Sequence, residues 1–263
     1  MDIFAHNFMI KAMIIGVILS IIIPAIGIVV VNKRISIIGD ALSHTSLAGV
    51  VIGLFAGITP IVGSIIACIA GSLFIEFIGK KFPGYRDLST AIVMSTGVGL
   101  ASLFSGFLKT SANFEAFLFG SIVAITDFEF YFTIIIGIVV IIAYILMYKE
   151  LMYLSFDEEG ARISGVKVDM INVIFMILIA FTISVSSRTV GVLIISSLMV
   201  IPSACSLQFK KGYKDTIILS SLFGLLFTIS GLMLSYYFDL KPGGTIVLIG
   251  VVTLLFIIFL KRK

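Results

Sequence analysis

Nine runs of predominantly apolar residues follow one another along the chain, separated by short polar segments. They cover residues 8–31, 36–57, 60–79, 88–108, 130–148, 169–187, 190–208, 216–237 and 244–260. Each run approaches the ~20 residues with which an α-helix crosses the hydrocarbon core of a bilayer. A further segment, 114–126, is too short for a comfortable span and is expected to be re-entrant or interfacial. The pattern predicts an all-α polytopic membrane protein, a single domain over residues 1–263 with about nine transmembrane helices (eight to ten).

The composition agrees with a membrane protein and excludes a soluble domain. Of the 263 residues, 60% are hydrophobic and 12% are charged, and the mean hydropathy is +1.24. Soluble domains carry about a quarter charged residues. The net charge of +4 is not a nucleic-acid signal, because basic residues in polytopic proteins encode orientation. We expect no nucleic-acid partner. Cys68 and Cys205 lie in apolar runs, support no disulfide framework and are expected to be small core residues.

Lysine and arginine are distributed unevenly between alternate loops. Four of the 18 lie on one side of the predicted membrane, namely Lys11, Lys109, Arg188 and Lys241. The other fourteen lie on the opposite side: Lys33, Arg34, Lys80, Lys81, Arg86, Lys149, Arg162, Lys167, Lys210, Lys211, Lys214, Lys261, Arg262 and Lys263. By the positive-inside rule, the larger set is cytoplasmic. We therefore expect the N-terminus outside and the C-terminus in the cytoplasm, as an odd number of spans requires.

The segment 34–57 carries the polar pair that is the main candidate for chemistry. Asp40 and His44 are four residues apart, which on an α-helix places them ~40° apart around the axis and about one turn apart along it. An acid at the centre of a bilayer helix costs roughly 2.5–3.5 kcal/mol on insertion scales, so such residues usually mark an ion or substrate pathway. A carboxylate and an imidazole at this spacing chelate a divalent transition metal. We predict a metal path at this pair; a structural hydrogen bond and the active pair of an intramembrane hydrolase are the alternatives.

The same segment has a stripe of small residues. Gly49, Gly53 and Gly57 are four apart and lie ~200° from the polar pair around the helix axis. Small residues at this spacing let a neighbouring helix approach closely in lipid. We expect the glycine face to pack against a helix while the polar face lines a cavity.

One loop on the predicted cytoplasmic side has the pattern of a short helix. Its sequence LSFDEEGARISGVKVD brings together Asp157, Glu158, Glu159, Ala161 and Gly165, with the spacing E-x-A-x-x-x-G. Acids favour a helix N-terminus and glycine favours a helix end. We predict a short helix within 155–166 that docks into a groove of another protein, with a plain solvated loop as the alternative.

Together these segments resemble the membrane-spanning subunit of bacterial ABC importers for zinc, manganese or iron, the ABC-3 permeases. The matching pieces, in the family's order, are GDALSHTSLAG at 39–49, FLFGSI at 117–122, SFDEEGARISGV at 155–166 and VGVLIISSLMVIPSA at 190–204. The resemblance implies that Asp40 and His44 coordinate metal and that 155–166 is the coupling helix that contacts the ATPase. It also implies a homodimeric pore in the bacterial cytoplasmic membrane, with an ATPase on each cytoplasmic face and a solute-binding protein that delivers metal from outside.

The chain has no G-x-x-x-x-G-K-[ST] motif to cradle ATP phosphates, so we expect no enzyme activity and ATP hydrolysis on a separate subunit. No permanently bound cofactor is expected, since the metal is cargo. An ion-coupled secondary metal carrier is the alternative function. Such carriers usually have paired broken helices and several intramembrane acids, whereas Asp40 is the only deep acid in this sequence. An intramembrane aspartyl protease needs two carboxylates that share a proton, and the sequence has no second mid-span aspartate. The donor pair suits manganese, zinc and iron alike, so the metal stays open.

Overall fold

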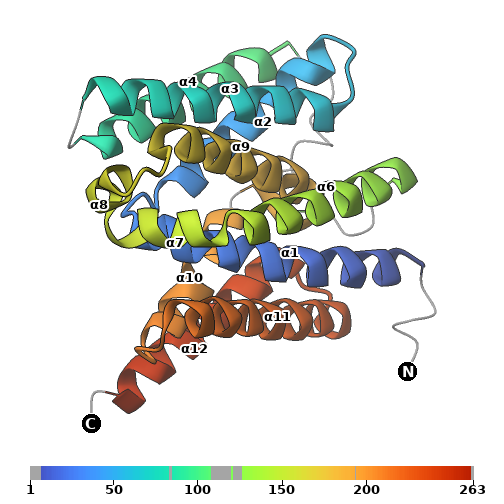
Figure 1. Ribbon diagram of the computed structural model, residues 1–263. Coiled ribbons are helices and arrows are strands. Elements are labelled where there is room, and N and C mark those ends of the chain that lie inside the picture. The colour runs from blue at the N-terminus through green and yellow to red at the C-terminus, as the bar shows by residue number, and fades with distance from the viewer. Residues whose placement is uncertain (1–6, 83–84, 108–119, 121–125, 193, 262–263) are drawn as a thin grey trace.

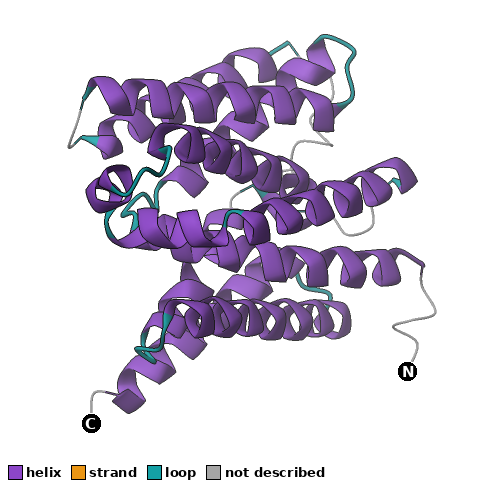
Figure 2. Ribbon diagram, in the orientation of Figure 1, coloured by secondary structure: helices purple, strands orange, loops and turns teal. Residues whose placement is uncertain are grey.

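The computed structural model describes residues 7–82, 85–107, 120, 126–192 and 194–261, and over these ranges the chain is a bundle of helices without strands (Figures 1 and 2). The elements in chain order are α1 (Asn7–Asn32), α2 (Ile38–Phe55), α3 (Pro60–Lys81), α4 (Arg86–Ser105), α6 (Asp127–Leu146), α7 (Tyr148–Phe156), α8 (Glu158–Ile163), α9 (Val168–Ser186), the π-helical turn η2 (Ser187–Gly191), α10 (Ile195–Leu207), α11 (Tyr213–Phe238) and α12 (Pro242–Lys261).

Within the described ranges, eight helices are long and apolar enough to cross a membrane, which confirms the predicted polytopic fold. The seventh predicted run behaves differently, because its helix α10 has only 13 residues and a length of about 20 Å, below the ~30 Å of the hydrocarbon core. The π-helical turn η2 and the left-handed Gly191, with φ of 96°, interrupt the run before α10 begins. Most of the segment 114–126 lies outside the described residues.

The long helices form two groups that lie side by side (Figure 1). The first group contains α2, α3 and α4, with α9 packed against α3. The second contains α1, α10, α11 and α12, and α6 and α7 lie along α1. The helix α1 begins at one end of the bundle and α12 finishes at the other. The two groups meet where α2 contacts α10 and where α9 contacts α1.

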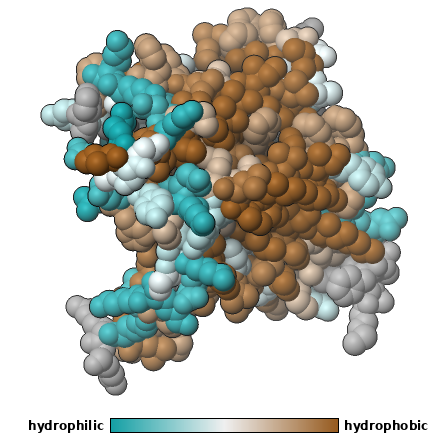
Figure 3. Space-filling model, viewed as in Figure 1, coloured by the Kyte–Doolittle hydropathy of each residue, from teal (hydrophilic) through white to brown (hydrophobic). Residues whose placement is uncertain are grey.

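The surface of the bundle has the polarity of a membrane protein. A broad apolar belt covers the middle, and hydrophilic residues gather towards the ends, above all near α8 and the end of α12 (Figure 3). Large apolar side chains such as Ile135, Leu248 and Phe259 are mostly exposed. In water such a surface would be costly, whereas in a bilayer it faces lipid. The chain is a multi-pass protein of the cell membrane.

Glycines set the shortest distances between neighbouring helices. A Cβ atom added to Gly49 would lie 2.4 Å from the carbonyl oxygen of Gly63 on α3, and one added to Gly63 would lie 2.3 Å from that of Gly49. Gly53 faces the same helix more loosely, with Gly63 Cα at 3.4 Å. Gly57 departs from the expected stripe: it lies beyond the end of α2 with a left-handed φ of 72°, and a Cβ there would meet no atom within 4 Å. Gly57 is a turn residue, because glycine adopts this conformation without strain.

Candidate functional site

A tight turn between α1 and α2 places Asp40 at the start of a helix. Arg34 has a left-handed φ of 58°, and the Ile35 amide donates to the Val30 carbonyl at 3.0 Å. The helix expected over 34–57 therefore begins only at Ile38, because the backbone at Arg34 is not helical. Asp40 falls in the first turn of α2, where the helix dipole favours a negative charge. The cost expected for an acid at the centre of a helix is reduced accordingly.

The carboxylate of Asp40 joins the two helix groups. Ser196, in the first turn of α10, donates a hydrogen bond of 2.5 Å to Asp40 Oδ1. The adjacent Gly39 approaches the same residue so closely that a Cβ there would lie 3.0 Å from Ser196 Cβ. Asp40 thus lies beside the N-terminal turns of two helices, and both favour an anion. The sequence pattern alone did not reveal Ser196 as the partner, because α2 and α10 are far apart in the chain.

His44 lies one turn further along α2, and both members of the pair are half-buried. The helix α4 packs against the backbone at this level: a Cβ on Gly97 would lie 2.8 Å from Thr45 N and 3.0 Å from the carbonyl carbon of His44. In the described part of the chain, no group of three or more His, Cys, Asp and Glu side chains is arranged to hold a metal ion. Asp40 and His44 therefore offer two donors on one helix face.

The short helix predicted within 155–166 is present as α8. Asp157 caps it, since its side chain accepts a hydrogen bond of 2.8 Å from the Gly160 amide. Gly165 follows the helix with a left-handed φ of 85°, and Ala161 is buried beneath it. Ile163 on the same helix is 88% exposed, which is an unusual position for a large apolar side chain at a polar end of the bundle.

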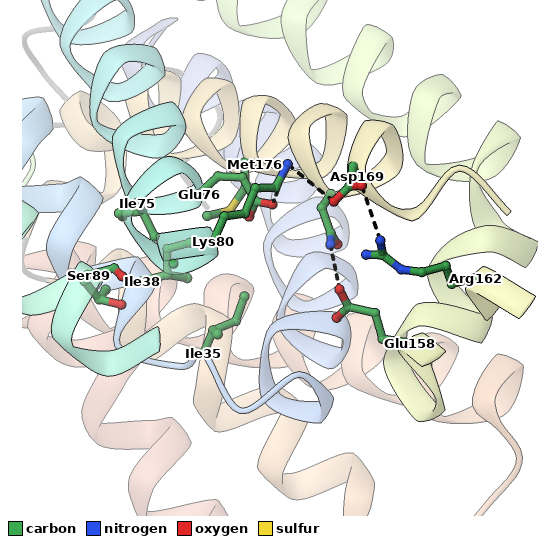
Figure 4. A pocket seen from close by; sticks show the side chains of 13 residues that line it. Ile35, Ile38, Ile75, Glu76, Lys80, Ser89, Glu158, Arg162, Asp169 and Met176 are labelled. Atoms are coloured by element: carbon green, nitrogen blue, oxygen red, sulfur yellow. Dashed lines mark hydrogen bonds and ion pairs between the residues drawn. The ribbon is translucent and has the colours of Figure 1, made fainter. Parts of the chain in front are cut away.

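A polar cavity of about 250 Å³ separates α8 from α3 and the start of α2 (Figure 4). Two chains of polar contacts run along it. In the first, the Lys33 ammonium donates to Asn172 Oδ1 at 2.7 Å and pairs with Glu158 at 3.4 Å, while Asn172 Nδ2 donates to Glu158 at 3.0 Å.

In the second, ion pairs of 3.4–3.7 Å connect Arg162 to Asp169, Asp169 to Lys80 and Lys80 to Glu76, in that order.

Sequence reasoning assigned Glu158 to the docking loop but missed the two residues that hold it. Lys33 counted only as a basic residue of a loop, because its partners are 125 and 139 residues away. Asn172 is a lone amide near the start of the apolar run 169–187. That isolated polar residue was the available signal, since an amide in such a run needs a hydrogen-bond partner.

The apolar belt, the spanning helices and the polar pair between two helix groups define a membrane transport protein. Residues 5–261 match the ABC 3 transport family, and the chain belongs to that family. A probable metal transport system membrane protein of Treponema pallidum is 37% identical over 98% of this chain and 97% of its own length. A manganese transport system membrane protein of Listeria monocytogenes is 32% identical over 97% and 91%. The solved structure of PsaBC from Streptococcus pneumoniae in complex with Fab superposes with a TM-score of 0.87, at 26% identity over 97% of this chain and 92% of that one.

Proposed function

We propose that this chain is the permease subunit of an ATP-driven importer for a divalent transition metal ion. Manganese is the first candidate, because the Listeria monocytogenes relative carries that ion in its name. Zinc and iron are the other two, since a carboxylate and an imidazole suit all three ions. The metal passes through as cargo, and the chain itself is not the enzyme of the complex.

The observation that carries this proposal is the placement of Asp40 and His44. They share one face of α2 and remain half-accessible, and Asp40 lies where the two helix groups meet. Two donors hold a transition metal only weakly, whereas such ions commonly take four ligands. A two-fold dimer brings two copies of the pair towards a shared axis and completes the site. A site divided between two copies also comes apart readily, and conduction needs a site that the ion can leave.

The proposed partners follow from the two ends of the bundle. We place the end that carries α8 in the cytoplasm, in agreement with the concentration of basic residues there. An ATPase subunit docks on α8 in each copy, and the exposed Ile163 supports this, because interface centres are rich in buried apolar anchors. A solute-binding protein delivers the metal at the opposite, extracellular end.

Transport by the reconstituted complex tests the metal pair. With the ATPase and the binding protein present, Asp40→Asn and His44→Ala are each expected to lower manganese uptake more than about 100-fold, beyond the 10–100-fold typical of residues that only orient ligands. Zinc and iron are added in turn as competitors. Thr45→Val is the matched control, since the Thr45 hydroxyl donates within α2, to the Ala41 carbonyl at 2.8 Å. Normal uptake by both site variants would refute the assignment.

A second test addresses α8 as the coupling helix. Gly165→Pro is expected to uncouple ATP hydrolysis from uptake, because proline fixes φ near −65° where the chain needs 85°. Glu159→Lys, on the exposed side, is expected to do the same by reversing a charge in the docking surface. The measured quantity is metal imported per ATP hydrolysed. The control is Gly212→Pro, at a position whose φ of −62° already suits proline. Parental coupling in both variants would contradict the docking role and the orientation together.

A further inference from the structure

Two groups of polar contacts lie beside α8, a more buried group around Lys33 and a more exposed group around Asp169, and members of both line the same cavity (Figure 4). In the more buried group, the Lys33 side chain is 5% exposed, Asn172 is buried, and the Glu158 side chain is 30% exposed. By contrast, the side chains of Arg162 and Asp169 are 60% and 59% exposed. Exposed ion pairs exchange freely with water and contribute little, whereas a buried ammonium requires its partners. The buried group therefore decides how α8 is held.

The buried group forms a triangle of side chains that links the end of α1 to α8 and α9. Lys33 follows α1, Glu158 is the first residue of α8, and Asn172 lies in the second turn of α9. Each side chain contacts the other two, and Glu158 uses both oxygens to do so. The cap from Asp157 to Gly160 fixes the backbone at Glu158 relative to the rest of α8. A displacement of α8 is thus transmitted to Lys33.

From Lys33 the connection along the chain to the proposed metal pair is short. The Lys33 amide donates to the Val29 carbonyl at 2.9 Å, which continues the last turn of α1. The left-handed Arg34 then reverses the chain, Ile35 is buried, and α2 begins at Ile38. Asp40 lies only seven positions after Lys33 in the sequence. A movement of Lys33 therefore shifts the first turn of α2, where Asp40 meets Ser196.

We propose that Lys33 is the positioning residue through which the coupling helix α8 sets the place of Asp40 in the transport cycle. The inference rests on the proposed function, since it needs an ATPase that moves α8. The Lys33–Glu158–Asn172 triangle transmits that movement. The exposed ion pairs of Arg162, Asp169 and Lys80 do not.

The test compares the two groups in the reconstituted complex, with manganese imported per ATP hydrolysed as the measured ratio. Lys33→Met keeps the length and apolar stem of the side chain and removes the charge, and it is expected to lower the ratio at least tenfold while ATP hydrolysis continues. Lys80→Met makes the same change in the exposed group and is expected to keep the ratio within twofold. The pair Lys33→Glu with Glu158→Lys restores opposite charges and is expected to recover most of the ratio that either single variant loses.

Three results would overturn the inference: a parental ratio in Lys33→Met, equal losses in Lys33→Met and Lys80→Met, or a charge-exchanged pair that assembles but stays uncoupled. A Lys33→Met chain that does not assemble with its ATPase also counts against the inference, because the role of the lysine would then be purely structural. Asp40→Asn distinguishes a failure of the proposed function from a failure of the role of Lys33. If Asp40→Asn abolishes uptake while Lys33→Met stays coupled, the proposed function stands and only the role of Lys33 fails.

Discussion

The two ends of α2 are held to their neighbours in different ways. Towards its C-terminal end, Gly49 and Gly63 bring the backbones of α2 and α3 together, with no space for even one added carbon atom on either glycine. At its N-terminal end, α2 meets α10 at Ser196, through a hydrogen bond to Asp40 and through the close approach of Gly39. One contact is backbone against backbone and has a single geometry. The other combines a looser glycine contact, in which a Cβ on Gly39 would lie 3.1 Å from Ser196 Cα, with a side-chain bond that can break and re-form.

This difference explains how α2 can stay packed against α3 while its first turn forms part of the proposed site. Close backbone packing in lipid is stabilised by van der Waals contact over the whole seam, so α2 and α3 stay together. A single hydrogen bond between membrane helices averages only about 0.6 kcal/mol and reaches about 1.7 kcal/mol. The start of α2 is therefore easier to separate from α10 than the rest of α2 is from α3. The polar pair lies at the separable end.

The largest effect is expected from adding a methyl group where the backbones of α2 and α3 pack against each other. Gly49→Ala adds a carbon 2.4 Å from the Gly63 carbonyl oxygen and 2.6 Å from Ala67 Cβ, so α2 and α3 must move apart. Overpacking of this kind typically costs about 1–3 kcal/mol. A lower thermal unfolding midpoint of the purified protein in detergent is the expected result. A midpoint equal to the parental one would show that the seam is looser than the glycine contacts indicate.

A smaller effect is expected at the separable end. Ser196→Ala removes the hydroxyl that donates to Asp40 and should lower stability by about 0.6–1.7 kcal/mol. Because the contact breaks more readily, we expect uptake to change while the folded protein remains abundant. Uptake and unfolding midpoint are measured on the same preparation. A loss of stability larger than that of Gly49→Ala would reverse the comparison.

The smallest effect is expected at Gly53, one turn from Gly49 on the same face. An added Cβ would lie 3.4 Å from Gly63 Cα, an ordinary contact distance. Alanine also favours a helix over glycine by roughly 0.5–1 kcal/mol, which offsets any residual crowding. Gly53→Ala should leave the free energy of unfolding within about 0.5 kcal/mol of the parental value, and the thermal unfolding midpoint should hardly change. A marked loss of stability would show that the close packing of α2 against α3 continues to the end of α2.

The sequence was sufficient for the spanning helices because a bilayer demands long apolar runs, and length and apolarity are visible without a fold. Helical spacing alone predicts that Asp40 and His44 share one face of α2, and their role as metal ligands stays a prediction. The sequence did not place the start of α2, since the left-handed turn at Arg34 has no glycine or proline to announce it. Nor did it pair Lys33 with Asn172, because contacts between distant segments depend on the packed bundle.

The distance along the chain between Lys33 and Glu158 also has a consequence for synthesis. Glu158 is made 125 residues after Lys33. At the usual 5–20 residues per second, this interval lasts about 6–25 s. During that time α1 and α2 have already emerged, while the lysine between them awaits the carboxylate that it contacts in the finished bundle. Until Glu158 appears, water or lipid headgroups must solvate this ammonium, which keeps the turn between α1 and α2 near the membrane surface. We infer that the α1–α2 hairpin reaches its final depth only after Glu158 has been made.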